Sequence, residues 1–79
     1  MKNESEIRKT IRTTLIECRK EKGVTQTDVA LYVGKTKTAV ASWEQGISLP
    51  DAETLFKLAA YYNKPIAFMY GENLERKEG

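Results

Sequence analysis

The chain has 79 residues, of which 41% are hydrophobic and 30% are charged, and its formal net charge is +2. This length suits one small domain with a free energy of unfolding on the order of 5 kcal/mol, and the hydrophobic fraction excludes a disordered-protein composition. Residues 1–46 hold nine Lys and Arg against six Asp and Glu, whereas residues 47–79 hold four against five. This imbalance is compatible with an anionic partner on the first half, although a surface without such a partner can show it too.

Missing residue types exclude several function classes. The single cysteine, Cys18, excludes an internal disulfide and suits a reducing compartment. The first residues, MKNESEIRK, lack the apolar core of a signal peptide, and no apolar run could span a bilayer, so we expect a cytoplasmic protein without a membrane partner. Histidine, phosphate loops and metal-ligand clusters are absent, and Cys18 falls on an apolar helical face. We therefore predict no enzyme activity, catalytic residue, metal, cofactor or small-molecule substrate.

Capping residues divide the chain into predicted helices. The first helix begins at about Ser5, its expected cap, and ends at Gly23. Its apolar face consists of Ile7, Ile11, Leu15 and Cys18, spaced by four, four and three residues. The second and third helices are expected over about residues 26–33 and 37–45. Their caps and stops are, in chain order, Thr25 with Asp28 in a capping box, Gly34, Thr36 and Gly46.

The rest of the chain predicts two more helices and a polar tail. Pro50 excludes helix at the residue before it, and Asp51 caps a fourth helix that ends at Asn63. The buried stripe of this helix is expected to be Leu55, Leu58, Ala59 and Tyr62. Pro65 begins a short fifth helix, IAFMY, that Gly71 closes. Since strand patterns are absent, we predict an all-α domain over residues 1–71 and a tail over residues 72–79.

The short connection between the second and third helices is typical of a helix-turn-helix. Ala30 provides the small side chain that closely crossing helices need, and Gly34 can adopt the positive φ of the turn. Val33, Val40 and Trp43 are expected to close the wedge from inside. The pattern predicts DNA binding through the third helix, and a helical hairpin that binds only proteins is the alternative.

Four motifs occur in the same order as in a known family. The segment RKEKGVTQTDVALYVGKTKTAVASWEQG, followed by LPDAETLFKLAAYYN, contains T-Q-x-x-x-A, G-x-T, W-E-x-G and P-x-x-x-T-L-x-K-L-A. Over roughly residues 14–71 the chain resembles the lambda-repressor-like, Xre-type helix-turn-helix family. The resemblance implies a five-helix domain whose third helix lies in the DNA major groove. It also implies a transcription regulator, which we expect to be a bacterial or phage-encoded, nucleoid-associated repressor that occupies promoters.

The resemblance implies which residues contact DNA. Lys37, Thr38 and Ser42 match positions that read base edges, and Ala39 and Ala41 flank them. Small residues let the helix approach the bases, Lys37 can donate to guanine, and Thr38 offers a hydroxyl and a methyl group. The positions expected to bind phosphate are Gln26, Gln45, Arg19, Lys35 and Lys22, with Lys20 as a further candidate. Solvated surface side chains are the alternative for each lysine.

The family also places an arginine of the first helix beside the glutamate of the third. Arg19 and Glu44 occupy these positions, so we predict a salt bridge that locks the third helix onto the first. Exposed salt bridges contribute only about 0 to 1 kcal/mol to the free energy of unfolding, so we expect this pair mainly to orient the third helix. Two separate solvated side chains are the alternative.

The chain departs from the family at several positions. Relatives often carry a longer polar side chain at Ser42 and a basic residue at Ser48, and Pro65 replaces a capping serine. The first helix also begins about two turns early. Tyr62, Ile66, Met69 and Tyr70 match core positions, whereas Phe68 and Tyr61 match exposed ones.

Phe68, Tyr61 and Ile7 are therefore candidates for a homodimer interface. The alternative is that the longer first helix covers them within one chain. The predicted partner is double-stranded DNA, bound by a homodimer. A protein-interaction adaptor, such as an antitoxin-like or bridging module, is the alternative function.

Overall fold

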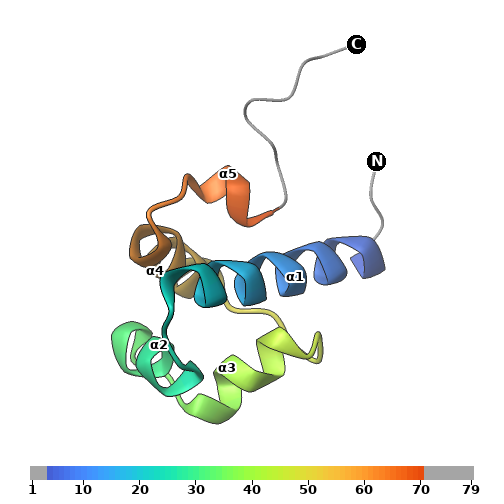
Figure 1. Ribbon diagram of the computed structural model, residues 1–79. Helices are drawn as coiled ribbons and strands as arrows, with labels where there is room; N and C mark the ends of the chain where they lie inside the picture. The colour runs from blue at the N-terminus through green and yellow to red at the C-terminus, as the bar shows by residue number, and fades with distance from the viewer. Residues whose placement is uncertain (1–3, 71–79) are drawn as a thin grey trace.

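The computed structural model describes residues 4–70, which form five α-helices and no strand (Figure 1). The helices are α1 (Glu4–Lys22), α2 (Gln26–Val33), α3 (Lys37–Glu44), α4 (Ala52–Tyr62) and α5 (Ile66–Met69). Helix α1 runs between the α2–α3 pair and α5, and α4 contacts α1, α2 and α5 (Figure 1). The predicted all-α, five-helix architecture is therefore confirmed. None of the described helices is long and apolar enough to cross a membrane.

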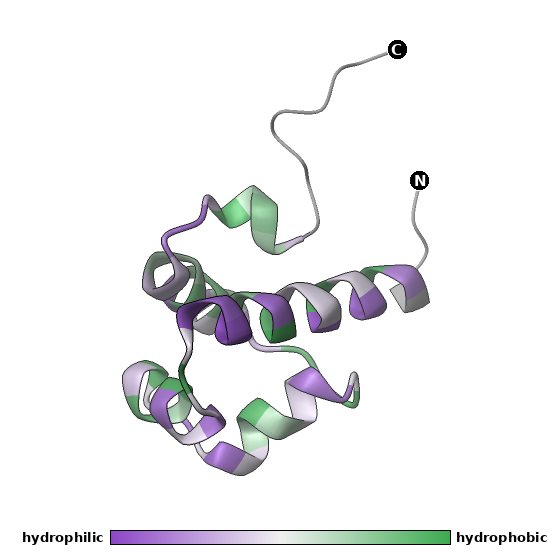
Figure 2. Cartoon of the chain, viewed as in Figure 1, coloured by the Kyte–Doolittle hydropathy of each residue, from purple (hydrophilic) through white to green (hydrophobic). Residues whose placement is uncertain are grey.

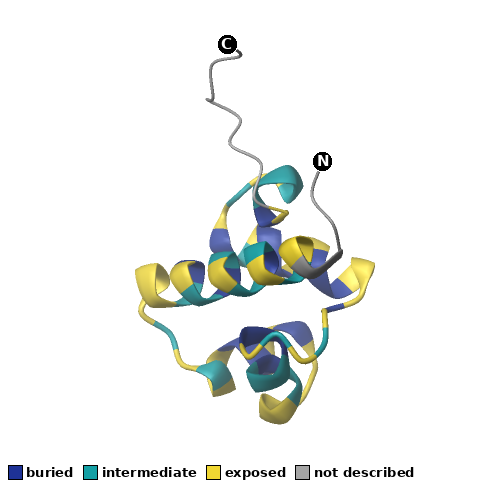
Figure 3. Ribbon diagram, turned by 90° about the vertical axis from the view of Figure 1, so that its right-hand side faces the viewer, coloured by how far each residue is buried: buried dark blue, intermediate teal, exposed yellow. Residues whose placement is uncertain are grey.

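One hydrophobic core joins all five helices. Hydrophilic and hydrophobic residues alternate along α1 (Figure 2), and its buried residues recur at helical spacing (Figure 3). The buried hydrophobic residues are Ile11, Leu15, Cys18, Val29, Ala30, Val33, Val40, Trp43, Leu55, Leu58, Ala59, Tyr62 and Met69. They include every member of the predicted stripe on α4 and the three residues expected to close the wedge between α2 and α3. The apolar patterns of the sequence therefore identify the core well.

Helices α2 and α4 begin and end at the predicted residues, and α3 begins where predicted but ends at Glu44, one residue early. The hydroxyl of Thr25 accepts from the amide of Asp28 at 3.1 Å, and the carboxylate of Asp28 accepts from the amide of Thr25 at 2.9 Å. This is the capping box. The amide of Ala39 donates to Thr36 Oγ1 at 3.0 Å, which caps α3. At the start of α4, the amide of Thr54 donates to the carboxylate of Asp51 at 2.8 Å. Gly34 (φ 75°) stops α2 and Asn63 (φ 58°) stops α4, both in the left-handed conformation.

Two details at the ends of the domain differ from the prediction. Helix α1 begins at Glu4, so Ser5 lies inside the helix instead of capping it. Acidic residues in a first turn suit the helix dipole, which favours an earlier start. Helix α5 ends at Met69, and Tyr70 is exposed, because a single turn does not carry it round to the core. Gly71 and the predicted tail over residues 72–79 lie outside the described residues.

Candidate nucleic-acid interface

Helices α2 and α3 are joined by a tight turn at Gly34. Gly34 has φ 75°, and the amides of Gly34 and Lys35 donate to the carbonyl oxygen of Ala30 at 2.9 and 3.0 Å. The buried side chains of Ala30, Val33 and Val40 fill the space between the two helices. Because the apolar face of α3 is used in this contact, its opposite face points away from the protein.

The exposed half of α3 is its N-terminal half. Lys37 and Thr38 are exposed, while Ala41 is partly buried. Val40 is buried, and Trp43 is only 6% exposed. The predicted direction of α3, with Thr38 outward and Trp43 inward, is therefore present in the structure.

The side chain of Ser42 is less accessible to a base than that of a fully exposed residue. Its side chain is partly buried, and its hydroxyl oxygen lies 2.7 Å from that of Ser48 in the loop after α3. The amide of Ile47 also donates to the carbonyl oxygen of Ser42, at 3.0 Å. Sequence reasoning treated Ser42 and Ser48 separately and missed this contact. The only available signal was that the two serines flank Gly46, a residue suited to reversing the chain.

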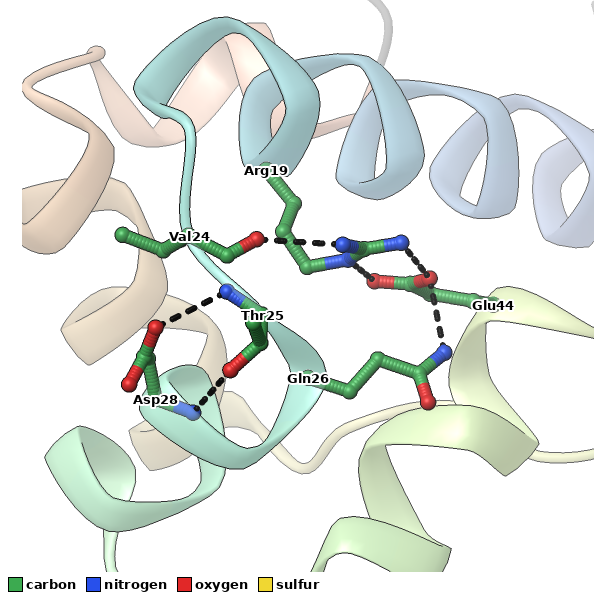
Figure 4. Close-up of polar contacts among 6 residues, drawn as sticks. All are labelled: Arg19, Val24, Thr25, Gln26, Asp28 and Glu44. Atoms are coloured by element: carbon green, nitrogen blue, oxygen red, sulfur yellow. Dashed lines mark hydrogen bonds and ion pairs between the residues drawn. The ribbon is translucent and has the colours of Figure 1, made fainter.

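Glu44 is the centre of a hydrogen-bond network that joins three helices (Figure 4). Arg19 donates to both of its carboxylate oxygens, from Nε to Oε2 at 2.7 Å and from Nη2 to Oε1 at 3.1 Å. Gln26 Nε2 donates to Oε1 at 3.1 Å, and Arg19 Nη1 donates to the carbonyl oxygen of Val24 at 3.1 Å. The predicted ion pair is thus present, and it also includes the first residue of α2.

The network is more buried than an exposed ion pair. The side chains of Arg19 and Glu44 are 18% and 7% exposed, so solvent screens the pair less than predicted. The hydrogen bond with Glu44 raises the pKa of Arg19 above its ordinary value, against the opposing effect of burial. Burial, and then the charge of Glu44, raises the pKa of Tyr62 well above its ordinary value, which keeps this phenol neutral. The arrangement compensates the negative charge of Glu44 inside the protein.

The predicted phosphate-binding residues lie in different surroundings. Gln26 starts α2 and is partly buried, with one amide hydrogen committed to Glu44 and a second left over. Gln45 is exposed directly after α3. Lys35 Nζ lies 3.9 Å from a carboxylate oxygen of Asp51, a weak surface contact.

Lys22 lies in an aromatic cluster at the end of α1. Its ammonium group is 4.8 Å from the centre of the Tyr61 ring, and that ring stacks on Tyr32 at a centroid distance of 4.3 Å. The structure therefore brings Gln26, Arg19 and Glu44 into contact, but it places Lys22 with the aromatic rings of α2 and α4.

Two of the three predicted dimer candidates are less exposed than their match to exposed family positions predicts. Tyr61 and Phe68 are partly buried against the core, and Lys22 and Lys64 lie over their rings. Ile7 is 37% exposed on α1. Among the residues that the structure describes, the most exposed large hydrophobic side chain is Leu31 at 77%, followed by others that sequence reasoning did not select. Those others include Ile47, Phe56 and Tyr32.

The thiol of Cys18, the single cysteine, is part of the core. Cys18 is buried, and this burial raises the pKa of its thiol, which disfavours the nucleophilic thiolate. Among residues 4–70, side chains that could bind a metal do not cluster in groups of three or more.

Comparison with known proteins identifies the family. A family model described as helix-turn-helix matches residues 15–69, which include all of α2, α3 and α4. A search of curated proteins gave no matching sequence. The matched segment contains the Gly34 turn, the outward face of α3 and the Glu44 network. The chain therefore belongs to the Xre-type, lambda-repressor-like helix-turn-helix family, and it carries a DNA-binding domain of the kind found in transcription regulators.

Proposed function

We propose that the protein recognises a specific double-stranded DNA sequence by placing the N-terminal half of α3 in the major groove. The observation that carries this proposal is the orientation of α3, with Lys37 and Thr38 exposed while Val40 and Trp43 hold the helix in the core. A major groove about 12 Å wide admits one helix if its leading side chains are short or extended. Binding at a promoter would exclude other proteins from it, so repression by occupancy is the regulatory mode.

Each exposed group has a chemical role in this proposal. Lys37 donates to O6 or N7 of guanine, and Thr38 contacts a thymine methyl group or donates through its hydroxyl. The free amides at the start of α2 bind a phosphate, aided by the second amide hydrogen of Gln26. The guanidinium group of Arg19 has five N–H donors. Three of them donate to Glu44 and to the carbonyl oxygen of Val24, so two remain for a phosphate. Lys35 and Gln45 extend the contact along the DNA backbone.

Selection from a random pool of DNA duplexes tests the proposal. The wild type is expected to enrich a defined sequence, and Lys37→Ala is expected to relax the preference at one or two base pairs, with a loss of about 5- to 150-fold in discrimination. Lys57→Ala is the matched control, since Lys57 is an exposed lysine on α4 that pairs with Glu53 at 3.7 Å. It should leave the selected sequence unchanged.

Two results would reject the reading role of α3. If Lys37→Ala and the wild type select the same sequence with equal preference, α3 is not the reading helix. If the wild type does not bind any duplex at low salt, the adaptor function is favoured instead.

A two-fold homodimer is the second part of the proposal. Helices α1 and α5 contact each other, and Ile7 in α1 and Tyr70 directly after α5 have exposed side chains. Phe68 lies in α5 and belongs to this proposed surface, whereas Tyr61 stacks on Tyr32 of α2 and is not part of it. A dimer would present two copies of α3 about 34 Å apart to successive major grooves on one face of the DNA.

A further inference from the structure

The loop after α3 folds back onto the outward side of that helix. Gly46 has φ 78°, and the chain then turns so that the amides of Ile47 and Ser48 point at the carbonyl oxygen of Ser42, at 3.0 and 3.5 Å. The side chains meet as well, with Ser42 Oγ and Ser48 Oγ 2.7 Å apart. Backbone and side-chain contacts therefore both hold Ser48 against Ser42.

This position lies next to the proposed reading residues. Ser42 follows Thr38 by four residues on α3, so the two side chains share one face of the helix. Both serines are partly buried, so each keeps some access to a ligand. The hydroxyl of Ser48 is thereby brought to the edge of the reading face by the loop and not by the helix.

Hydrogen bonding between the two hydroxyls restricts what Ser42 can offer. The bond uses one of the two available protons, so only one O–H group stays free to donate. When Ser42 donates to Ser48, Ser42 presents only lone pairs and accepts from the amino group of adenine or cytosine. When Ser48 donates to Ser42, the Ser42 O–H can donate to guanine or to O4 of thymine. A serine without this partner can do either, so it distinguishes bases poorly.

We propose that Ser48 is a positioning residue that determines DNA specificity through Ser42. It orients the Ser42 hydroxyl, and the direction of the bond between the two hydroxyls determines whether Ser42 accepts from the facing base or donates to it. This inference rests on the proposed reading of DNA by α3. It also gives a role to two short side chains at positions where relatives often carry longer polar or basic ones.

Selection from random duplexes with six variants tests the inference. Ser48→Ala is expected to lose the preference at one base pair, from roughly fivefold to almost none, which is the range of one net hydrogen bond. Ser42→Ala should lose the preference at the same base pair, and the double variant should lose no more than either single one. Ser48→Thr keeps the hydroxyl and should keep the preference, whereas the equally shaped Ser48→Val should lose it.

The sixth variant, Thr13→Ala, removes an exposed hydroxyl from α1 and should select the wild-type sequence. If Ser48→Ala and Ser48→Val select the wild-type sequence with undiminished preference, the inference is wrong and the proposed function stands. A uniform loss of affinity on all sequences, with the preference retained, also overturns it, because that result indicates only a structural role. If the wild type selects no sequence, the proposed function fails and this inference fails with it.

Discussion

Glu44 lies at the end of α3, where a free carboxylate would repel the phosphates of DNA. Its charge is instead compensated by Arg19, which binds both carboxylate oxygens, and by the amide of Gln26. Arg19 belongs to α1, Gln26 begins α2 and Glu44 ends α3, so one carboxylate fixes three helices relative to one another. A bidentate, largely buried pair of this kind is geometrically more restrictive than a surface ion pair.

Removal of this carboxylate should therefore destabilise the domain. Glu44→Ala leaves the partly buried charge of Arg19 without a partner and Gln26 without its acceptor. We expect the free energy of unfolding to fall by about 2–3 kcal/mol, which lowers Tm by about 10–20 °C for a domain of this size. Thermal unfolding followed by circular dichroism measures the shift. Glu17→Ala, which removes an exposed carboxylate from α1, should change stability by less than about 0.5 kcal/mol. Equal effects of the two variants would contradict a structural role for the network.

At the scale of the element, the helices that form the site are short. Helices α2 and α3 have eight residues each, which is too short for a helix to be stable in isolation. Tertiary packing and side-chain caps hold them in place, with caps at Thr25, Thr36 and Asp51. Two of the caps involve carboxylates that accept backbone N–H bonds, and these bonds make helix stability depend on pH.

The pH dependence has a defined sign. Hydrogen bonds from the backbone and side chain of Thr25 lower the pKa of Asp28, and those from the side chain and backbone of Thr54 lower the pKa of Asp51. Because each folded pKa lies below the unfolded one, the stabilisation is fully present above the ordinary aspartate pKa of about 3.9. It is lost as the pH falls through the lowered values.

Asp28→Asn with Asp51→Asn should keep much of the capping, since asparagine also caps helices, but it removes this titration. We expect the decrease in Tm between about pH 6 and about pH 2 to be smaller in this double variant than in the wild type. Glu17→Gln, which removes a carboxylate remote from the caps, is the control. A double variant whose Tm falls as steeply as that of the wild type would show that the caps do not contribute to acid sensitivity.

At the scale of the whole molecule, the proposed DNA-binding and dimer surfaces lie on different sides of the domain. The α2–α3 pair lies on one side of α1 and α5 on the other, so the proposed DNA and dimer surfaces do not overlap (Figure 1). In the proposed dimer, this separation would let two copies meet through α1 and α5 while both copies of α3 stay free. A symmetric dimer of this kind recognises a DNA site with matching two-fold symmetry.

Sedimentation tests the dimer. The wild type is expected to sediment as a dimer at concentrations on the order of tens of micromolar, and Ile7→Glu should shift it toward monomer, because a charge is costly in an apolar interface. Phe56→Glu is the matched control, since Phe56 is 61% exposed on α4, outside the proposed surface. A monomeric wild type whose selected DNA sequence lacks a two-fold repeat would rule out this part of the proposal.

Local patterns in the sequence were sufficient for the helices, most of the core and the direction of α3. Caps such as Thr25 and Asp28 act over three residues, and a residue such as Trp43 shares a helical face with Val40 by spacing alone. The pairing of Arg19 with Glu44 was predicted only through the family resemblance. The start of α1 at Glu4 was missed because the residue types at this end permit a helix that begins at either Glu4 or Ser5.

The sequence by itself determined an all-α helix-turn-helix domain, since spacing, caps and turn glycines are properties of neighbouring residues. Only the tertiary structure decided which side chains are free at the surface. It placed Ser48 against Ser42, brought Gln26 to Glu44, and partly buried Tyr61 and Phe68 while leaving Leu31 exposed. These relations depend on how a loop turns and how helices cross, because a shift of about one residue in either changes which side chains meet.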